Sequence, residues 1–209
     1  MNDSQIWTEK YRPKTFQEIQ GHKGIIERIR ALVAQKNLPH LLLAGPPGSG
    51  KTTVSLVIAK ELYGDYWRQN FLELNSSDDR GIDVVRNTIK EFAKTKALGN
   101  FPFKLILLDE CDAMTKEAQQ ALRRTMETYA TTTRMILSAN FSSKIIDPIQ
   151  SRCTVFRFKP LNPEEIKGYI QRVIAGEGLE MNEEAIAAVI DLSNGDVRRL
   201  TNILQGCAA

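Results

Sequence analysis

Residues 45–53 read GPPGSGKTT, which fits the phosphate-binding loop pattern of Gly, four residues, Gly, Lys and Thr. The apolar run HLLLA at 40–44 comes directly before this loop, and 52–64 after it has the pattern of a helix. The loop glycines allow backbone N–H groups to wrap a phosphate chain that any Cβ would crowd. A strand, this loop and a helix in that order predict a nucleotide-binding α/β domain.

Each part of the loop has an expected role. Lys51 supplies a positive charge to the β- and γ-phosphates, and the Thr52 hydroxyl is placed to ligate Mg²⁺. The helix that follows adds its positive N-terminal end. The predicted nucleotide contacts of the loop are Gly45, Pro46, Pro47, Gly48, Ser49, Gly50, Lys51, Thr52 and Thr53.

A second motif, LILLDECD at 105–112, is an apolar strand that ends in acids. In a parallel sheet, such carboxylates lie at the same edge as the phosphate-binding loop. Asp109 is the expected Mg²⁺ partner, and Glu110 is the candidate base that polarises the attacking water. The alternative is that Glu110 is only a solvated loop acid. Because no guanine-reading Asn-Lys-x-Asp segment is found, ATP is favoured over GTP.

The strand candidate at 134–140 ends in Asn140. A polar residue at this point is either a simple turn former or a functional amide. If this strand lies beside the one that leads into the phosphate-binding loop, Asn140 is expected to reach the γ-phosphate or the lytic water.

Five short apolar segments alternate with helical patterns, which predicts a parallel sheet covered on both faces. The segments are 40–44, 71–75, 104–109, 134–140 and 154–158. After KPLNP at 159–163 only helices are expected, at about 163–175, 183–193 and 196–205. We therefore expect an α/β nucleotide-binding domain over 1–160 and a helical lid over 161–209. The opening segment 7–22 is expected to be irregular, because Pro13 bars a regular helix.

The composition is ordinary for a globular protein, with 42% hydrophobic and 25% charged residues. No apolar run approaches the length of a membrane span, and the N-terminus lacks the apolar region of a signal peptide. Cys111, Cys153 and Cys207 are far apart, which argues against structural zinc and disulfides and suits a reducing compartment. A net charge of +3 is too small to indicate a nucleic-acid partner by itself.

Together these motifs resemble AAA+ ATPases and, within them, the small subunits of replication factor C, the sliding-clamp loader of archaea and eukaryotes. The resemblance covers essentially the whole chain. It is carried by WTEKYRPKTFQEIQGH, GPPGSGKTT, NSSDDRGIDVVR, LLDECDAM, QQALRRTME, SAN, IQSRC and GDVRR, of which the first, third and seventh are specific to clamp loaders. It implies a P-loop AAA+ fold with a five-stranded parallel sheet and a small helical lid, an ATPase that uses ATP and Mg²⁺, and a place in the cytoplasm of an archaeon or the nucleus of a eukaryote.

The resemblance also implies roles for single residues. Asn140 matches the family's sensor 1, and Arg152 matches the arginine finger, which acts on ATP held by the neighbouring subunit. Arg198 matches sensor 2, which reaches from the lid to ATP in its own subunit. Arginine suits the spread charge of a transferring phosphoryl group. The alternative for both arginines is an ordinary surface side chain.

In the family the N-terminal segment covers the adenine, which implies contacts from Tyr11, Arg12 and Pro13. This sequence has DECD where DEAD is commoner, so Cys111 adjoins the candidate catalytic acid. A cysteine at this place suggests sensitivity to oxidation. Clamp-loader subunits continue into a helical collar domain that holds the ring together. That domain is missing from these 209 residues, so we expect a fragment of a longer protein whose stable ring formation is in doubt.

The segment 80–104 is rich in basic residues, and Arg86 and Lys90 are spaced to share one face of a helix. Alone, this pattern indicates a solvated face. The resemblance instead implies that Arg80, Arg86 and Lys90 track duplex phosphates without reading sequence. It places the clamp surface near 92–103, where two phenylalanines, Phe101 and Phe103, are either exposed anchors or part of the core.

The leading hypothesis is therefore a clamp-loader ATPase subunit, with other loader subunits, the sliding clamp and primer–template DNA as partners. Two alternatives stay open. One is an ATP-holding assembly subunit with little turnover, and the other is a different AAA+ machine, such as a branch-migration motor or a remodeller.

Overall fold

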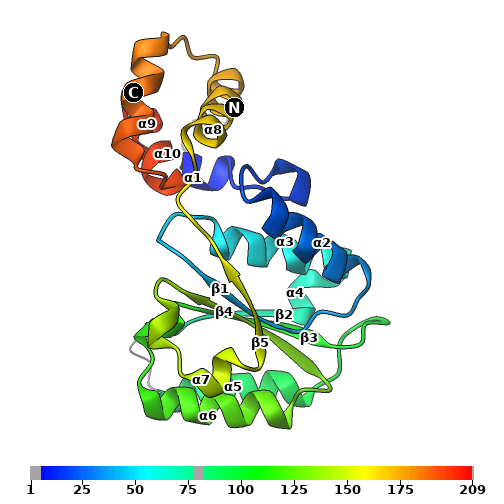
Figure 1. Cartoon of the computed structure of the whole chain (residues 1–209). Helices are drawn as coiled ribbons and strands as arrows, with labels where there is room; N and C mark the ends of the chain where they lie inside the picture. Colours follow the sequence, from blue (N-terminus) through cyan, green and yellow to red (C-terminus); the bar gives the residue numbers. More distant parts are fainter. Residues whose placement is uncertain (1–5, 78–81, 209) are drawn as a thin grey trace.

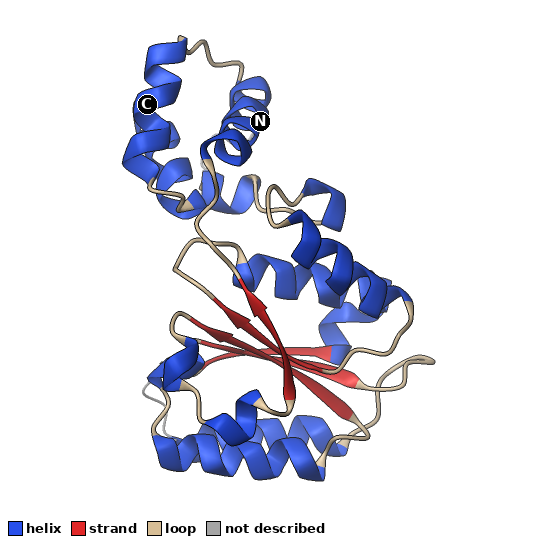
Figure 2. Ribbon diagram, in the orientation of Figure 1, coloured by secondary structure: helices blue, strands red, loops and turns tan. Residues whose placement is uncertain are grey.

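A computed structural model of the chain describes residues 6–77 and 82–208. Within them, five parallel strands form one sheet in the order β2-β3-β4-β1-β5 (Figure 1, Figure 2). The strands are β1 (His40–Ala44), β2 (Phe71–Asn75), β3 (Lys104–Asp109), β4 (Thr133–Ala139) and β5 (Cys153–Arg157). All five were predicted to within a residue or two, because buried parallel strands are continuous apolar runs.

Helices cover both faces of the sheet, and a helical bundle stands above its carboxyl edge (Figure 1). The helices longer than one turn are α2 (Lys23–Ala34), α3 (Lys51–Tyr63), α5 (Ile82–Lys94), α6 (Lys116–Thr128), α8 (Pro163–Glu177), α9 (Glu183–Ser193) and α10 (Val197–Cys207). Short helices are α1 (Trp7–Lys10), α4 (Trp67–Asn70) and α7 (Asp147–Gln150), with 3-10 turns at Phe16–Glu18, Gly64–Tyr66, Cys111–Ala113 and Ser142–Lys144.

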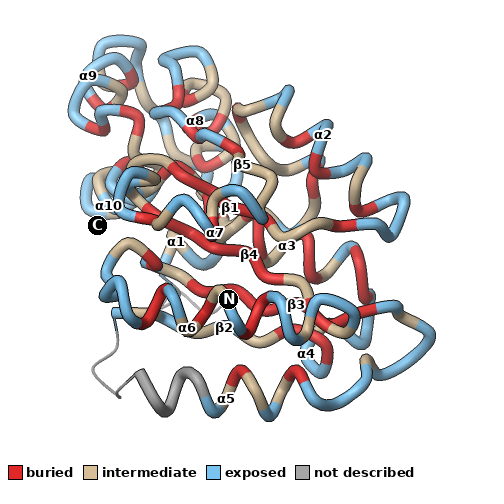
Figure 3. Tube along the Cα trace, turned by 60° about the horizontal axis from the view of Figure 1, so that its bottom comes forward, coloured by how far each residue is buried: buried red, intermediate tan, exposed pale blue. Residues whose placement is uncertain are grey.

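Successive side chains of β1 point to opposite faces of the sheet and enter two separate apolar clusters. Leu41 and Leu43 pack with residues of α2 and α3. Leu42 packs with residues of α5, α6 and α7, such as Ile89 and Leu122. The central strands are buried on both faces, as the red segments of Figure 3 show. This double burial holds the carboxyl ends of the strands, where the site lies, in fixed positions.

The lid begins where the sequence predicted a helix start. The Asn162 side chain accepts a hydrogen bond from the Glu165 N–H, the Glu165 carboxylate accepts one from the Asn162 N–H, and Pro163 occupies the first turn. This reciprocal capping satisfies N–H groups that the helix itself leaves unpaired. The capping fixes the start of α8 at the end of the extended segment that follows β5.

The N-terminal arm, residues 7–22, is more regular than expected. It contains α1 and a 3-10 turn at Phe16–Glu18, separated by Pro13. Pro13 does interrupt helical structure, but a four-residue helix fits in front of it. The prediction of an irregular segment was therefore wrong for Trp7–Lys10.

A third apolar cluster joins the arm to the lid. Tyr11 packs with residues of α8, α9 and α10, including Ile170, Val189 and Leu200. The contact lies where α1 meets α10, at the base of the lid (Figure 1). The end of α1 thus packs with α8, α9 and α10. A division between two domains near residue 160 stays a prediction.

Phe101 and Phe103 belong mainly to the core. Phe103 is buried in the cluster under α2 and α3, and Phe101 packs edge-on against Tyr63 and Tyr66. The exposed apolar side chain of this loop is Leu98 instead. In the described ranges, 6–77 and 82–208, none of the helices has the length and apolar character needed to cross a membrane.

Candidate nucleotide-binding site

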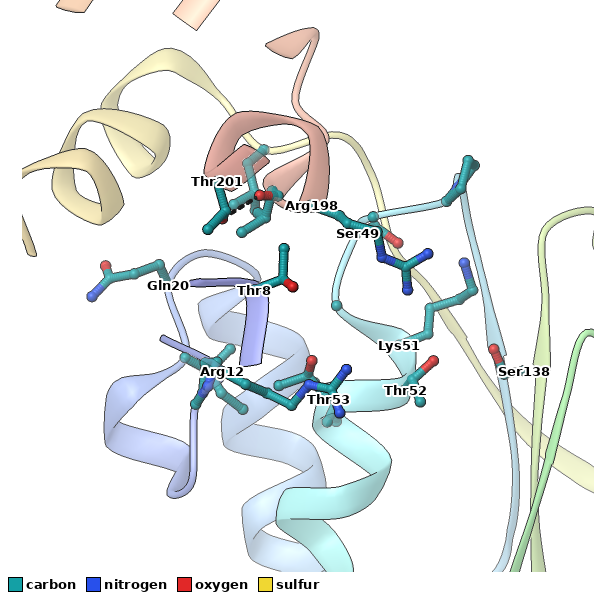
Figure 4. A pocket seen from close by; sticks show the side chains of 18 of the residues that line it. Thr8, Arg12, Gln20, Ser49, Lys51, Thr52, Thr53, Ser138, Arg198 and Thr201 are labelled. Carbon is teal, nitrogen blue, oxygen red and sulfur yellow. Dashed lines mark hydrogen bonds between the residues drawn. The ribbon is translucent and has the colours of Figure 1, made fainter. Parts of the chain in front are cut away.

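A cavity of about 320 Å³ lies above the carboxyl ends of β1, β3 and β4. Three parts of the chain line it: the phosphate-binding loop with the start of α3, the N-terminal arm, and the lid (Figure 4). The predicted site residues among its lining are Tyr11, Arg12, Pro13, Pro47, Gly48, Ser49, Gly50, Lys51, Thr52, Thr53, Asp109, Glu110, Asn140 and Arg198.

The Lys51 ammonium is held at the centre of the loop. It donates hydrogen bonds to the backbone oxygens of Gly45 at 2.7 Å and Pro46 at 2.9 Å, and to Asn140 Oδ1 at 3.1 Å. Gly45 and Pro46 do not line the cavity, so their part is to hold this lysine by their carbonyls. The side chain is 7% exposed, and burial lowers the pKa of Lys51, against the opposing effect of nearby Asp109. A cation that is buried among neutral acceptors favours an anionic ligand.

The loop glycines adopt the backbone that the motif requires. Gly48 has φ +69° and Gly50 has φ +94°, both in the left-handed region. Gly50 is the N-cap of α3, so the free N–H groups of the first helical turn face the cavity side of the loop. A polyphosphate therefore fits here on conformational and electrostatic grounds.

The two expected magnesium ligands touch each other. Thr52 Oγ1 donates a hydrogen bond to Asp109 Oδ2 at 2.6 Å, and the other carboxylate oxygen accepts one from the Glu110 N–H at 2.9 Å. A hydroxyl and a carboxylate are oxygen donors of the kind that Mg²⁺ prefers, with phosphate oxygens and waters completing its shell. The residues present thus fit a nucleotide-bound magnesium ion.

Glu110 follows β3 in an unusual backbone conformation. Its φ of +54° lies in the left-handed region, which residues other than glycine rarely adopt. Strain of this kind concentrates at functional sites and here sets the direction of the acid relative to Asp109. The Glu110 side chain is exposed and lines the cavity, so it is accessible to water there.

Asn140 lies beside the phosphate-binding loop. β4 pairs with β1 so that Ala139 is opposite Ala44, and the Gly45 N–H donates to the Ala139 oxygen at 3.1 Å. The Asn140 N–H in turn donates to Asp112 Oδ1 at 3.1 Å. The strand that ends before Asn140 therefore lies beside the strand that leads into the phosphate-binding loop, as a functional role for Asn140 requires.

The lid contacts the loop directly. The Val197 N–H donates to the Gly48 oxygen at 3.2 Å, and a Cβ at Gly48 would lie 1.9 Å from Asp196 Oδ1. Gly48 thus serves both the loop turn and the approach of α10. Arg198 comes one residue after this contact and points toward Lys51 (Figure 4). Arg198 is therefore placed at the phosphate end of the cavity.

Several lining residues were not predicted, because they belong to no local motif. They include Thr8, Gln20, His22, Ser138, Tyr169 and Thr201. Among the described side chains, His22 Nε2 and Ser138 Oγ are buried without a hydrogen-bond partner. Polar atoms of this kind are rare in folded proteins and are explained by a ligand or water. Only the folded arrangement of arm, sheet and lid brings these residues to one cavity.

Arg152 does not line the cavity. It follows α7, where its guanidinium donates to the Pro148 oxygen at 2.7 Å and pairs with Glu127 of α6 at 2.5 Å. Arg123 pairs with the same Glu127 oxygen at 2.8 Å. Arg152 thus takes no part in the cavity of its own chain, and its role as a finger stays a prediction.

The predicted DNA residues are only partly described. Arg80 lies outside the described residues, and for Arg86 the structure gives only its place in α5. Lys90 is half-buried and lies in a groove between α5 and α6 that also includes Arg124. The groove is lined by Lys90, Glu117, Gln120, Ala121, Arg124, Thr125, Thr128 and Tyr129.

The structure argues against the oxidation sensitivity that the sequence suggested as possible for Cys111. The thiol is buried, donates to the Leu108 oxygen at 3.0 Å, and has its pKa raised to about 12 by burial. Oxidation proceeds through an accessible thiolate, which this position disfavours. Cys111 instead packs in the cluster under α5 and α6.

The family model described as ATPase family associated with various cellular activities (AAA) matches residues 41–161. The chain belongs to this AAA family. The AAA fold is also seen in the Holliday junction branch migration motor RuvB of Thermotoga maritima, which has 20% sequence identity and a TM-score of 0.75. That match covers 93% of this chain and 64% of RuvB, and it concerns the fold alone.

Within AAA proteins, the chain is homologous to replication factor C small subunits. It is 52% identical over 209 residues to that of Archaeoglobus fulgidus, which spans 100% of this chain and 66% of the relative. It is 55% identical over 204 residues to that of Staphylothermus marinus, with 98% and 62% covered. The chain thus spans just under two thirds of the length of these relatives.

Proposed function

We propose that this AAA protein binds and hydrolyses ATP as a small subunit of a sliding-clamp loader. The observation that carries the proposal is the meeting of Lys51, Asp109, Glu110 and Asn140 around one cavity. These residues lie at or just beyond the carboxyl ends of three neighbouring strands, β1, β3 and β4. They match the needs of phosphoryl transfer, which are positioning and charge stabilisation. The identity to replication factor C small subunits supports the choice of clamp loader among AAA machines.

Each residue then has a part in the reaction. Lys51 neutralises charge on the β- and γ-phosphates. Thr52 and Asp109 would hold a magnesium ion, which would supply positive charge to the transferring group. The Glu110 carboxylate orients the attacking water and accepts its proton. The Asn140 amide, fixed by its bond to Lys51, donates to the γ-phosphate or to this water.

Two arginines complete the site from outside the sheet. Arg198 acts on nucleotide in its own chain, because it reaches the phosphate end of the cavity from the lid. Arg152 acts in trans on the nucleotide of a neighbouring subunit. Its absence from the lining of its own chain's cavity supports this assignment, and hydrolysis then depends on assembly.

The proposed partners are other loader subunits, the clamp and primer–template duplex. Arg80, Arg86 and Lys90 contact duplex phosphates without reading sequence, and the exposed Leu98 marks the loop nearest the clamp. Residues 161–209 act as a lid that closes on the nucleotide, and residues 1–160 carry the loop and the acids. The cellular place follows the source, cytoplasm in an archaeon or nucleus in a eukaryote.

The test is ATP turnover by the full-length subunit in its ring, measured with and without clamp and primed DNA. Joint stimulation by both is the expected result. Turnover that is indifferent to clamp and to primed DNA would leave a different AAA machine. Binding of ATP with negligible turnover in all conditions would favour an assembly subunit.

A further inference from the structure

The contact between the N-terminal arm and the lid is concentrated on one carboxylate. Glu177, the last residue of α8, accepts hydrogen bonds on Oε1 from Lys10 Nζ at 2.6 Å and from Tyr11 Oη at 2.7 Å. The Glu177 side chain is only 16% exposed, and the Lys10 side chain is 41% exposed. The bond to Tyr11 is therefore the better shielded of the two from solvent.

Tyr11 fits the lid closely. The side chain is 7% exposed, and its ring packs in the cluster with Ile170 and Leu200. A Cβ at Gly176 would lie 2.4 Å from the Tyr11 hydroxyl, so the hydroxyl reaches Glu177 only because position 176 has no side chain. Burial, followed by the bond to Glu177, raises the pKa of Tyr11 to about 12, and the phenol stays a donor.

A second pair connects the arm to α8. Arg172 donates to Glu18 Oε2 at 3.1 Å, and the same oxygen accepts from the Lys14 N–H at 3.0 Å. The arm is thus attached to α8 at both ends of the turn around Pro13. Between these two points of attachment, Phe16 of the arm packs in the cluster under α2 and α3.

The attached arm forms one wall of the nucleotide cavity. Thr8, Glu9, Tyr11, Arg12 and Pro13 line it, while Glu177 does not. Lys51 and Thr52 mark the phosphate end, and Figure 4 shows Thr8, Arg12 and Gln20 on the other side of the loop. The arm therefore faces the part of a nucleotide that is not phosphate, its base and ribose.

We propose that Glu177 is a positioning residue for nucleotide binding. By holding Tyr11 against α8, it places the arm where it contacts the base and ribose, and it leaves the phosphate contacts unaffected. The inference rests on the proposed ATP-binding function and adds to it a residue that never touches the ligand.

The test is calorimetric titration of the 209-residue chain with Mg²⁺–ATP and, separately, with Mg²⁺–tripolyphosphate, which lacks base and ribose. For Glu177→Ala, the Kd for ATP is expected to rise about tenfold, the scale of one hydrogen bond to a charged group, while that for tripolyphosphate stays within about twofold. Tyr11→Phe removes only the hydroxyl and should raise the ATP Kd about threefold, again without affecting tripolyphosphate.

Three further variants sharpen the result. Glu177→Gln keeps an acceptor for Tyr11 and should restore ATP affinity to within about twofold of the wild type. Gly176→Ala pushes the tyrosine away and should behave like Glu177→Ala. Glu183→Ala is the matched control, because Glu183 pairs with Lys167 at 2.8 Å on the exposed surface of the same lid and should change neither Kd.

Unchanged ATP affinity in both Glu177→Ala and Tyr11→Phe would overturn the inference. Equal losses for ATP and tripolyphosphate would also overturn it, because they would show a general loss of lid structure. The inference would also be overturned if the wild-type chain bound ATP no more tightly than tripolyphosphate, because base and ribose would then add no affinity. Failure of the wild type to bind ATP at all would instead overturn the proposed function itself.

Discussion

Thr52 and Asp109 are joined by a hydrogen bond of 2.6 Å although 57 residues separate them in the chain. Thr52 comes after β1 and Asp109 ends β3, with β4 between these strands in the sheet. The parallel order brings both strand ends to one edge, as in other doubly wound sheets. The pair marks the point where the phosphate-binding loop motif and the candidate catalytic acids meet in one cavity.

Replacing the candidate base should separate binding from hydrolysis. For Glu110→Gln, we expect ATP turnover to fall about a hundredfold or more, because the amide cannot accept the proton of water. ATP affinity should change less than about threefold, since no bond from the Glu110 side chain to the loop is seen. Phosphate release and calorimetry measure the two quantities. Turnover that survives in Glu110→Gln would reassign the base.

Asn140 is expected to act on the reaction more than on affinity. Asn140→Ala removes the acceptor of the Lys51 bond and the amide donor at the phosphate end. The loss of one such donor lowers kcat by about a hundredfold in comparable sites. A steady-state measurement should therefore show reduced kcat with little change in KM. A change confined to KM would make Asn140 a binding residue only.

The trans role of Arg152 predicts complementation. In full-length, ring-forming subunits, Arg152→Ala and Glu110→Gln should each abolish most turnover. Mixed rings should regain part of it, because a Glu110→Gln subunit still offers Arg152 to a neighbour with an intact Glu110. Arg152→Ala should leave ATP binding by the isolated chain unchanged. Mixed rings as inactive as either parent would contradict a finger supplied by the neighbour.

Lys90 should contribute one phosphate contact to DNA binding. Lys90→Ala is expected to weaken DNA binding by the ring uniformly across sequences and to lower the salt slope by about one. The variant should also reduce DNA-stimulated turnover. Lys23→Ala is the control, because Lys23 is exposed at the start of α2 on the opposite layer. An unaltered slope in Lys90→Ala would exclude this helix from the DNA interface.

His40 should make the fold sensitive to acid. Burial and the neighbouring Arg134 lower the pKa of His40 from 6.5 to about 4. The unfolded chain therefore binds a proton between pH 6.5 and 4 that the folded chain does not, so stability falls as pH drops through this window. The loss approaches about 3 kcal/mol at pH 4 for a shift of this size.

Urea unfolding across the same window measures this effect. In the wild type, the Met135 N–H donates a hydrogen bond to His40 Nδ1 at 3.0 Å. His40→Asn keeps an acceptor for this N–H. The variant should show a flatter acid dependence than the wild type. Identical slopes for the two proteins would assign the acid sensitivity to other groups.

The strands and the motif residues were predictable because their signals are local. Apolar runs marked β1 and β3, and the spacing of Gly50, Lys51 and Thr52 marked the loop. The arm was not predictable in the same way. Tyr11 owes its burial to Gly176 and Glu177, and the bond to Glu177 spans 166 residues, so no periodicity or spacing in the sequence reports it.

The lining residues without motifs were missed for a similar reason. Ser138 lies inside a buried strand, and His22 is the last residue of the arm, so neither looks functional in the sequence. Cys111 shows the opposite error, since its place beside Glu110 suggested reactivity that its burial removes. Burial and long-range contact decide such cases, and both depend on the complete fold.

All the roles proposed for these residues require the cavity to be an ATP site centred on Lys51. Calorimetric titration of the 209-residue chain with Mg²⁺–ATP tests this directly, with Lys51→Ala as the paired variant. We predict binding of one ATP per chain by the wild type and a loss of affinity of about a hundredfold or more in Lys51→Ala, since a buried charge partner is removed. Absence of binding by the wild type, or equal affinity in the two proteins, would contradict it.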